Sequence, residues 1–438
     1  MNSIKQKGFS IIELMVAMAI GLFLLLGLVA LFTNSSSLNR AQSGLAQLQE
    51  NGRYAIARIK NDIEQAGQMH CASMTMPNDI IANWDQGYQS SVWYAHRDFN
   101  FNANGMPNVG DITLDTIGGG DNDQLGDAPV PAAGIANYYP IDRRFLMQGH
   151  DCIAGTCEPS EGNGATQGAD WLTDFRAAGV TDGSRASSTD ILTVRYLSGG
   201  YPITGWAGNT FTIDGESGLS GPALVSDCSN AYIDNAAWSP TSVTLSNAPP
   251  GFDVISNTRA FNLDTDLQTV SYFVGVDADP GNSSRMVSSL YRSVNGNTQQ
   301  LVEGVERLDF FYLAQLQTGH VVRMTADEVQ SISNGDGNQP TGISGPNGCI
   351  VPPRANLLNG LQVANDQGCL WRSIYAVEVH LLLNTVADST IEDNATYIYS
   401  PDGDTRQDPS GGLASGLDSG RMYRREFSAV IPIRSYTL

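Results

Sequence analysis

An unbroken apolar run near the N-terminus is the strongest hydrophobic pattern in the chain. Residues 9–32 (FSIIELMVAMAIGLFLLLGLVALF) contain a single charged side chain, that of Glu13. As an α-helix this run would be about 36 Å long, which is enough to cross the hydrocarbon core of a membrane. It is longer than the apolar stretch of a cleavable secretory signal, and an ordinary anchor would not explain its carboxylate. We therefore predict a transmembrane helix over residues 9–32.

The flanks of this run predict its orientation. Lys5 and Lys7 precede it, and residues 1–12 contain no acidic side chain. Because basic flanks stay on the cytoplasmic side of a membrane, we expect a cytoplasmic N-terminus. Everything after residue 32 is then periplasmic or extracellular.

A helical period continues beyond the apolar run. Residues 33–68 are mostly polar, with apolar or small residues at steps of three, four and seven: Leu38, Leu45, Leu48, Gly52, Ile56, Ile59 and Ile63. No proline occurs within residues 9–76, and Gly67 is a suitable helix stop because glycine adopts the left-handed conformation. The pattern predicts one helix over residues 9–67, whose second half is amphipathic and covered along this stripe.

From residue 69 onward the pattern favours short strands between clusters of Gly, Asn, Asp and Ser. We expect one β-rich domain over residues 69–438, with a short helix near residues 170–178 and long loops at 102–170, 331–368 and 401–420. The predicted fold class is α+β, with a long N-terminal helix packed on an antiparallel sheet. The predicted strands are Asp190–Leu197, Asn209–Ile213, Val270–Val276, Met286–Arg292, Val305–Leu313, His320–Met324, Ser373–Leu383 and Glu426–Arg434.

The charge of the chain limits its partners. There are 24 Lys and Arg residues against 45 Asp and Glu residues, which gives a net charge of −21. A protein this acidic repels phosphate backbones and anionic lipid surfaces, so we expect no nucleic-acid binding.

The cysteines predict disulfides. An even count of six in an exported chain favours pairing, and no C-x-x-C motif occurs. Neighbours in sequence suggest the pairs 152–157 and 349–369, which leaves 71 with 228, and this is one of fifteen possible connectivities. The candidates are Cys71, Cys152, Cys157, Cys228, Cys349 and Cys369.

Catalytic motifs are missing from the sequence. It contains no H-E-x-x-H, no G-x-S-x-G, no phosphate-binding loop and no dinucleotide fingerprint. We therefore expect no enzymatic activity and no cofactor. Calcium is the one ligand for which two acidic loops offer oxygen atoms, although solvated loops are the simpler interpretation. The candidate ligands are Asp121, Asp123, Asp127, Asp402 and Asp404.

The residues around the start of the apolar run resemble the N-terminal signal of type IV prepilins. These are Gly8 at the end of a short basic leader, Phe9 after it, and Glu13 at the fifth mature position. The resemblance implies that prepilin peptidase removes residues 1–8 and that the new amino terminus of Phe9 is methylated. It also implies anchoring in the inner membrane before assembly. In the assembled filament, Glu13 would set subunit register by pairing with the amine of a neighbouring subunit as the helices pack together.

Later segments resemble the PilW family of minor pilins. These are QENGRYAIARIKNDIEQAG, SSTDILTVRYL, LVEGVERLDFFYL and REFSAVIPIR. The resemblance implies a role in pilus assembly and initiation near the filament tip. The implied partners are other minor pilins and the major pilin, through stem-helix packing, and a tip adhesin.

Two alternatives remain open at this level. A pseudopilin of a type II secretion system would share the N-terminal features, since J-type pseudopilins are close relatives. The large loops could instead form an adhesion module with exposed tryptophans as contact anchors, although tryptophan is more often buried in a core. The candidates are Trp84, Trp93, Trp171, Trp206 and Trp238.

Overall fold

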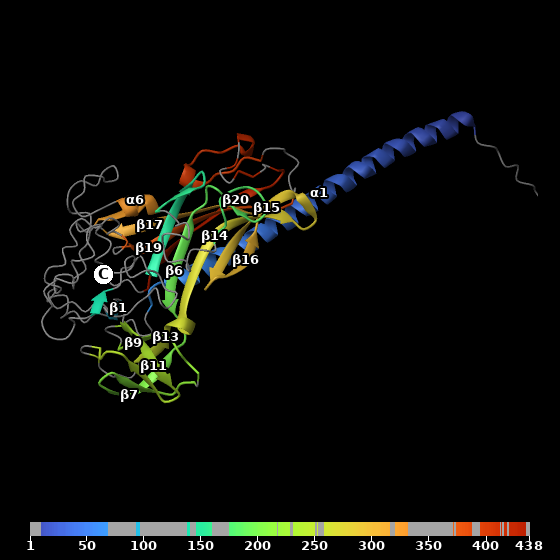
Figure 1. Cartoon of the computed structure of the whole chain (residues 1–438). Coiled ribbons are helices and arrows are strands. Elements are labelled where there is room, and N and C mark those ends of the chain that lie inside the picture. Colours follow the sequence, from blue (N-terminus) through green and yellow to red (C-terminus); the bar gives the residue numbers. More distant parts are fainter. Residues whose placement is uncertain are drawn as a thin grey trace, which may run out of the picture.

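One long helix enters a body of β-sheets with its C-terminal half (Figure 1). The computed structural model describes residues 10–68, 93–96, 138–140, 146–159, 175–216, 218–227, 231–249, 252, 258–315, 320–331, 371, 374–387, 395–411, 413, 416–417 and 420–434. The helix is α1 (Ile11–Glu64). The predicted α+β class, with a long N-terminal helix and antiparallel sheets, is confirmed.

The end of α1 differs slightly from the prediction. The helix stops at Glu64, and the amide of Gln65 closes its last turn on the carbonyl of Asp62. Gly67 has a left-handed φ of 66° and donates its amide to the carbonyl of Arg195 at 2.7 Å. Residues 65–67 therefore form the turn that ends the helix, because the left-handed glycine redirects the chain into the body.

The buried stripe of α1 is shorter than predicted. Leu48, Gly52, Ile59 and Ile63 are buried as expected. Leu38 is 59% exposed, because the body begins to cover the helix only near Leu48. The buried stripe also includes Ala55 and Asp62, which the apolar pattern did not single out.

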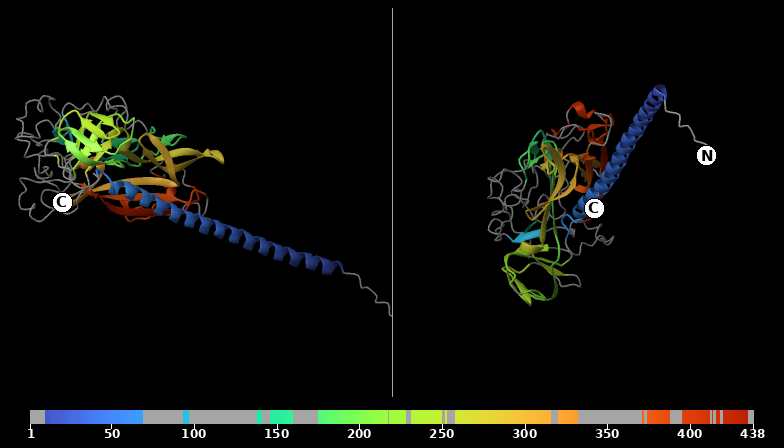
Figure 2. Two further views of the ribbon diagram at one scale, coloured as in Figure 1. Left: turned by 90° about the horizontal axis from the view of Figure 1, so that it is seen from below. Right: turned by 90° about the vertical axis from the view of Figure 1, so that its right-hand side faces the viewer.

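The sheet that lies along the second half of α1 is called the stem sheet. Its strand order is β18-β17-β19-β20, and every neighbouring pair is antiparallel. Phe427, Ala429, Ile431 and Ile433 share one face as predicted, and they pack in the same core as α1. Figure 2 shows this sheet alongside the helix. The strands are β17 (Val305–Gln315), β18 (Val321–Met324), β19 (Ile374–Asn384) and β20 (Arg424–Pro432).

A second sheet, called the middle sheet, faces the stem sheet across the core. Its strand order is β16-β15-β14-β6-β3-β4, with β5 paired to β14. Side chains of α1, the stem sheet and the middle sheet join in one hydrophobic cluster. The strands are β3 (Met147–Ile153), β4 (Thr156–Glu158), β5 (Ser184–Arg185), β6 (Ile191–Leu197), β14 (Leu267–Asp279), β15 (Asn282–Val294) and β16 (Asn297–Glu303).

A third sheet, called the insert sheet, is built mainly from the chain between β6 and β14. Its order is β11-β12-β8-β7-β13-β9-β10-β1-β2. It has its own hydrophobic cluster around Phe211 and Val243, and it lies at the end of the body away from the membrane half of α1 (Figures 1 and 2). The strands are β1 (Trp93–His96), β2 (Tyr138–Pro140), β7 (Tyr201–Ala207), β8 (Thr210–Ile213), β9 (Ala223–Ser226), β10 (Ala231–Asp234), β11 (Ala236–Ser239), β12 (Ser242–Leu245) and β13 (Arg259–Asn262).

The remaining elements are short. They are α5 (Leu263–Asp266), α6 (Ala326–Ser331) and two 3-10 turns, Ser400–Asp402 and Pro409–Gly411. The helix predicted near residues 170–178 is wrong over the described residues 175–178, since 175–177 have no regular structure and Ala178 makes a single β-bridge to Arg185. All eight predicted strands are present, with bounds shifted by a few residues.

Candidate functional site: the stem helix and its junction with the body

The N-terminal half of α1 is uncovered. Every large apolar side chain from Ile11 to Phe32 is more than half exposed, and the most apolar stretch has no residue buried in the body. By length and composition this helix is able to cross a membrane. A surface this apolar is stable only in lipid or against other helices.

Glu13 is the single charge in the apolar stretch. It lies in the first turn of α1, where the unpaired amide groups of a helix favour a negative charge. Glu13 makes no ion pair among the described residues. Gly8 and Phe9, the predicted cleavage and methylation positions, lie outside the described residues.

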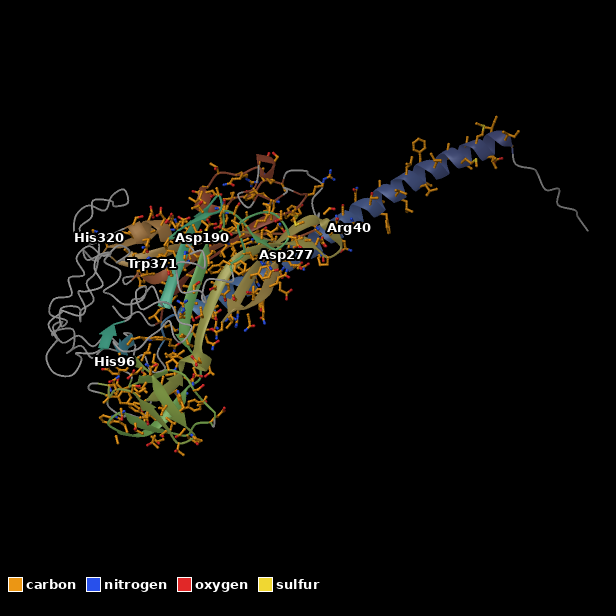
Figure 3. The ribbon with its side chains drawn as sticks, in the orientation of Figure 1. Arg40, His96, Asp190, Asp277, His320 and Trp371 are labelled. Carbon is orange, nitrogen blue, oxygen red and sulfur yellow. A yellow bond between two sulfur atoms is a disulfide. The ribbon has the colours of Figure 1, made fainter. Side chains whose placement is uncertain are left out.

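A polar stretch of α1 separates the apolar half from the body. It covers residues 33–47, where no residue is buried. Arg40 marks this stretch in Figure 3. Hydroxyl side chains here donate hydrogen bonds to carbonyls of the preceding helix turn, as the Thr33 hydroxyl does to the Val29 carbonyl at 3.0 Å. Full burial of α1 residues in the body therefore begins only beyond this stretch, at Leu48.

A glycine lies where α1 closely approaches β20, one turn beyond the buried Leu48. A Cβ at Gly52 would lie 2.5 Å from ring atoms of Phe427 on β20. Such a separation is shorter than carbon atoms tolerate, so a larger residue would push the helix off the stem sheet. Gly52 therefore sets how closely α1 approaches β20.

A buried carboxylate forms the centre of the junction. Asp62 is fully buried, and its Oδ1 accepts from the Tyr196 hydroxyl at 3.0 Å and from Arg292 Nη2 at 3.1 Å. Its Oδ2 accepts from Arg292 Nε at 2.7 Å and from the Tyr272 hydroxyl. The donors come from β6, β14 and β15, so one side chain of α1 is bonded to three strands of the middle sheet. We call these four residues the Asp62 clamp.

The electrostatics of the clamp favour an ion pair with neutral tyrosines. Burial and the Asp62 carboxylate raise the pKa of Tyr196 to about 12. The same two causes raise the pKa of Tyr272 much further. Burial alone would lower the pKa of Arg292, but the hydrogen bonds and charge of Asp62 outweigh it and raise that pKa. Near neutral pH both tyrosines are therefore neutral hydrogen-bond donors beside the ion pair of Asp62 and Arg292.

The C-terminal end of α1 is also attached to the body. Arg434 Nη2 lies 2.5 Å from Glu64 Oε2, and the Arg434 amide donates to the Glu64 carbonyl at 3.3 Å. Lys60 forms a second, exposed ion pair with Glu64 at 3.8 Å. These contacts are near the surface, so removal of one of them should cost far less stability than removal of one partner from the buried clamp.

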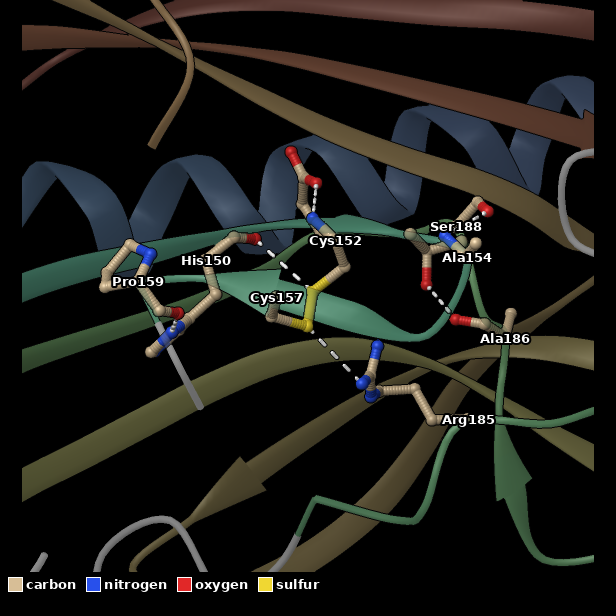
Figure 4. Close-up of a disulfide and its surroundings, with 10 residues drawn as sticks. His150, Cys152, Ala154, Cys157, Pro159, Arg185, Ala186 and Ser188 are labelled. Carbon is tan, nitrogen blue, oxygen red and sulfur yellow. Dashed lines mark hydrogen bonds between the residues drawn. A yellow bond between two sulfur atoms is a disulfide. The ribbon is translucent and has the colours of Figure 1, made fainter. Parts of the chain in front are cut away.

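A disulfide closes the β3–β4 hairpin. Cys152 and Cys157 are joined with an S–S distance of 2.02 Å, and both are buried (Figure 4). The Cys152 amide donates to Asp190 Oδ1 at 3.1 Å, and Arg185 approaches the Cys157 sulfur. This is the pair that closeness in sequence suggested. The other candidates lie outside the described residues: Cys71, Cys228, Cys349 and Cys369.

His150 on β3 is a buried titratable group beside this hairpin (Figure 4). Its Nδ1 lies 2.7 Å from the Pro159 carbonyl. Burial lowers its pKa to about 4, and the positive charge of Arg185 acts in the same direction. His150 is therefore neutral near pH 7, and its protonation opposes folding.

The predicted calcium ligands receive little support. Asp121, Asp123 and Asp127 lie outside the described residues. The Asp402 carboxylate accepts hydrogen bonds from Arg307 and Gln407. Within the described part of the chain, no three His, Cys, Asp or Glu side chains, Asp404 included, are placed to share a metal ion.

The tryptophans proposed as contact anchors have different environments. Trp93 is 1% exposed, which corrects the expectation of an exposed anchor, because it belongs to the core between the insert and middle sheets. Trp206 is 43% exposed, and Trp238 is half-buried. Trp84 and Trp171 lie outside the described residues.

Comparison with known proteins gives one result. The family model described as the prokaryotic N-terminal methylation motif matches residues 4–29. No match was found among curated proteins or among solved structures. The motif implies processing by a prepilin peptidase and assembly with other pilins, and it fits anchoring in the inner membrane before assembly. The methylation motif and the long apolar helix that follows it together support a type IV pilin-like protein.

Proposed function

We propose that this chain is a minor pilin of a type IV pilus, that it helps to start filament assembly, and that it lies at or near the filament tip. The observation that carries the proposal is the uncovered apolar half of α1, with Glu13 as its single charge. This half overlaps the methylation motif. A helix of this kind passes from lipid into a bundle of similar helices without exposing apolar surface to water.

Glu13 supplies the specificity of this transfer. A carboxylate at membrane depth costs about 2–3 kcal/mol on insertion scales, so an isolated Glu13 opposes insertion. Cleavage before Phe9 would create a cationic amine at the same depth on every neighbouring subunit. Pairing Glu13 with that amine neutralises both charges, and it does so only in the register that brings the two groups together.

The tip location is favoured by the shape of the body and by the PilW resemblance. The insert sheet enlarges the body at the end away from the membrane half of α1 (Figure 1). A subunit in the middle of a filament has neighbours on both sides along the axis. A subunit at the tip has neighbours only below it, which leaves room for this enlargement.

We propose no enzymatic role and no bound cofactor for this chain. The buried carboxylate of Asp190 is already engaged in internal contacts with the amides of Cys152 and Phe310. The Asp402 loop is held by Arg307 rather than kept open for a cation. Prepilin peptidase then acts on this chain as the processing enzyme.

The deciding experiment replaces Glu13 with alanine in the intact chain. We expect the leader to be removed normally, with N-methylated Phe9 found by mass spectrometry of the mature protein. Incorporation into pili, measured by immunoblotting of sheared filaments, should fall strongly. The matched control is Glu50→Ala, which removes an exposed carboxylate from the same helix. Normal incorporation of the Glu13 variant, or a mature chain that begins at Met1, would contradict the proposal.

A second candidate function is surface attachment through the insert sheet. Trp206 offers a large exposed ring that is held in place, since its Nε1 donates to the Gly208 carbonyl at 2.6 Å and its ring packs near Phe252. Trp206→Ala should then abolish attachment while piliation stays normal.

Loss of protein secretion rather than of pili in a strain without this chain would instead favour a type II secretion pseudopilin.

A further inference from the structure

The contact between α1 and the body has an apolar part that sets no unique position. Leu48, Ala55, Ile59 and Ile63 pack against the two sheets as one continuous cluster. Apolar contact is non-directional, so a helix turned or shifted on such a surface keeps much of its stabilisation. This part of the contact holds the helix without fixing how the body is oriented around it.

The Asp62 clamp has the opposite property. All four of its hydrogen bonds end on the two oxygens of one buried carboxylate, and their donors are fixed on three different strands. A rotation or shift of α1 would leave a buried charge and buried donors unpaired, which is far more costly than a displaced apolar contact. A single buried polar group is a known means of fixing helix register.

We infer that Asp62 is a positioning residue, which sets the rotation and the axial register of the body on the stem helix. The inference deepens the proposed pilin role. Glu13 lies on the same helix about 74 Å before Asp62, as the rise per residue gives. The body contacts of a neighbouring subunit and the Glu13 contact form together only if the body faces one direction. Asp62 fixes that direction.

Removal of the whole clamp separates positioning from stability. Asp62→Ala alone would leave Arg292 charged and unpaired, and this variant could fail to fold. The informative variant replaces the four residues together, with Asp62→Leu, Tyr196→Phe, Tyr272→Phe and Arg292→Leu. Exchange of a buried ion pair for apolar side chains of similar volume often preserves stability. The control is a second buried ion pair, Glu306 with Arg424 at 2.7 Å, which lies within the body. It is exchanged in the same way, with Glu306→Leu and Arg424→Leu.

The readout is the distance between the stem and the body in the full chain in detergent. Spin labels are carried by noncanonical amino acids at Ser43 on α1 and Gln299 on β16, both exposed, and their separation is measured by pulsed electron resonance. The wild-type chain and the Glu306–Arg424 control should give one narrow distance. The apolar clamp variant should lose that single distance and give a broad distribution, although its circular dichroism spectrum stays native.

A milder variant covers the case in which the apolar clamp does not fold. Tyr196→Phe with Tyr272→Phe keeps the ion pair but removes two donors, and it should broaden the distance distribution to a smaller extent. Unchanged narrow distances in every clamp variant that folds would overturn the inference. Filament incorporation is measured in parallel. If the wild-type chain itself never enters pili, the pilin role is rejected. A broadened distance in the clamp variants would then still support the positioning role.

Discussion

The two halves of α1 each carry one carboxylate in an apolar setting, and the two carboxylates have opposite surroundings. Glu13 lies on a bare helix surface and has no ion-pair partner in the described chain. Asp62 is fully buried and receives four hydrogen bonds from the body. The carboxylate of the N-terminal half therefore requires a partner from another subunit, whereas the carboxylate of the C-terminal half finds all its partners within its own subunit. Assembly specificity belongs to the first half, and subunit geometry belongs to the second.

The largest expected effect comes from a substitution in the C-terminal half of α1, whose carboxylate is bonded within the subunit. Asp62→Ala leaves the Arg292 charge buried without its partner, which should lower the free energy of unfolding by about 3–5 kcal/mol. The measurement is urea unfolding of the full chain in detergent. Glu64→Ala is the control, since it removes only near-surface ion pairs and should cost less than about 1 kcal/mol. Equal losses in the two variants would contradict the central role of the clamp.

The second prediction concerns His150 on β3, a buried residue of the body outside the Asp62 clamp, and the loss of stability in acid. The pKa of His150 falls from 6.5 to about 4 on folding, so the unfolded chain takes up its proton first as the pH falls. Stability from this residue is present above pH 6.5 and is lost as the pH falls through about 4. The loss should reach roughly 3 kcal/mol. His150→Leu, which binds no proton, should lack this component, and an identical acid profile in both chains would exclude it.

The smallest effect tests how closely α1 approaches the stem sheet. Gly52→Ala places a methyl group against the Phe427 ring and should cost about 1–3 kcal/mol through overpacking. Phe427→Leu in the same chain should recover part of that loss, because the smaller side chain leaves room for the methyl group. Unfolding curves of the two single variants and the double variant give the coupling. Strict additivity would show that the two positions do not compete for space.

Local patterns were sufficient to predict the helix and the long strands. The apolar run, the Gly8–Phe9–Glu13 motif and the alternation in β20 are each contained within a short segment. The Asp62 clamp was not predictable in this way, because Asp62 lies 134 and 210 residues from its tyrosine partners and 230 from Arg292. In the sequence it resembles any polar residue of an amphipathic helix. Its place in the buried stripe, between Ile59 and Ile63, was the one available indication.

The other differences also have physical reasons. Leu38 fits the helical period, but the period does not show where the covering body begins. Most strands of the insert sheet are four residues long, too short for alternation to distinguish them from loops. Trp93 was considered as an exposed contact anchor, but the fold places it in the core between two sheets, which is the more frequent environment of tryptophan.

The chain leaves the middle sheet at Leu197 and returns to it at Leu267, and these two residues are direct cross-strand partners. The Ser198 amide also donates to the Asp266 carbonyl at 2.9 Å, so the two ends of the excursion are already joined. The excursion therefore begins and ends next to Tyr196 of the Asp62 clamp, at one point of the middle sheet. Strands β7 to β13 therefore start and end at one point of the fold, yet β1 and the buried Trp93, which lie outside this excursion, depend on it for strand pairing and for cover from solvent.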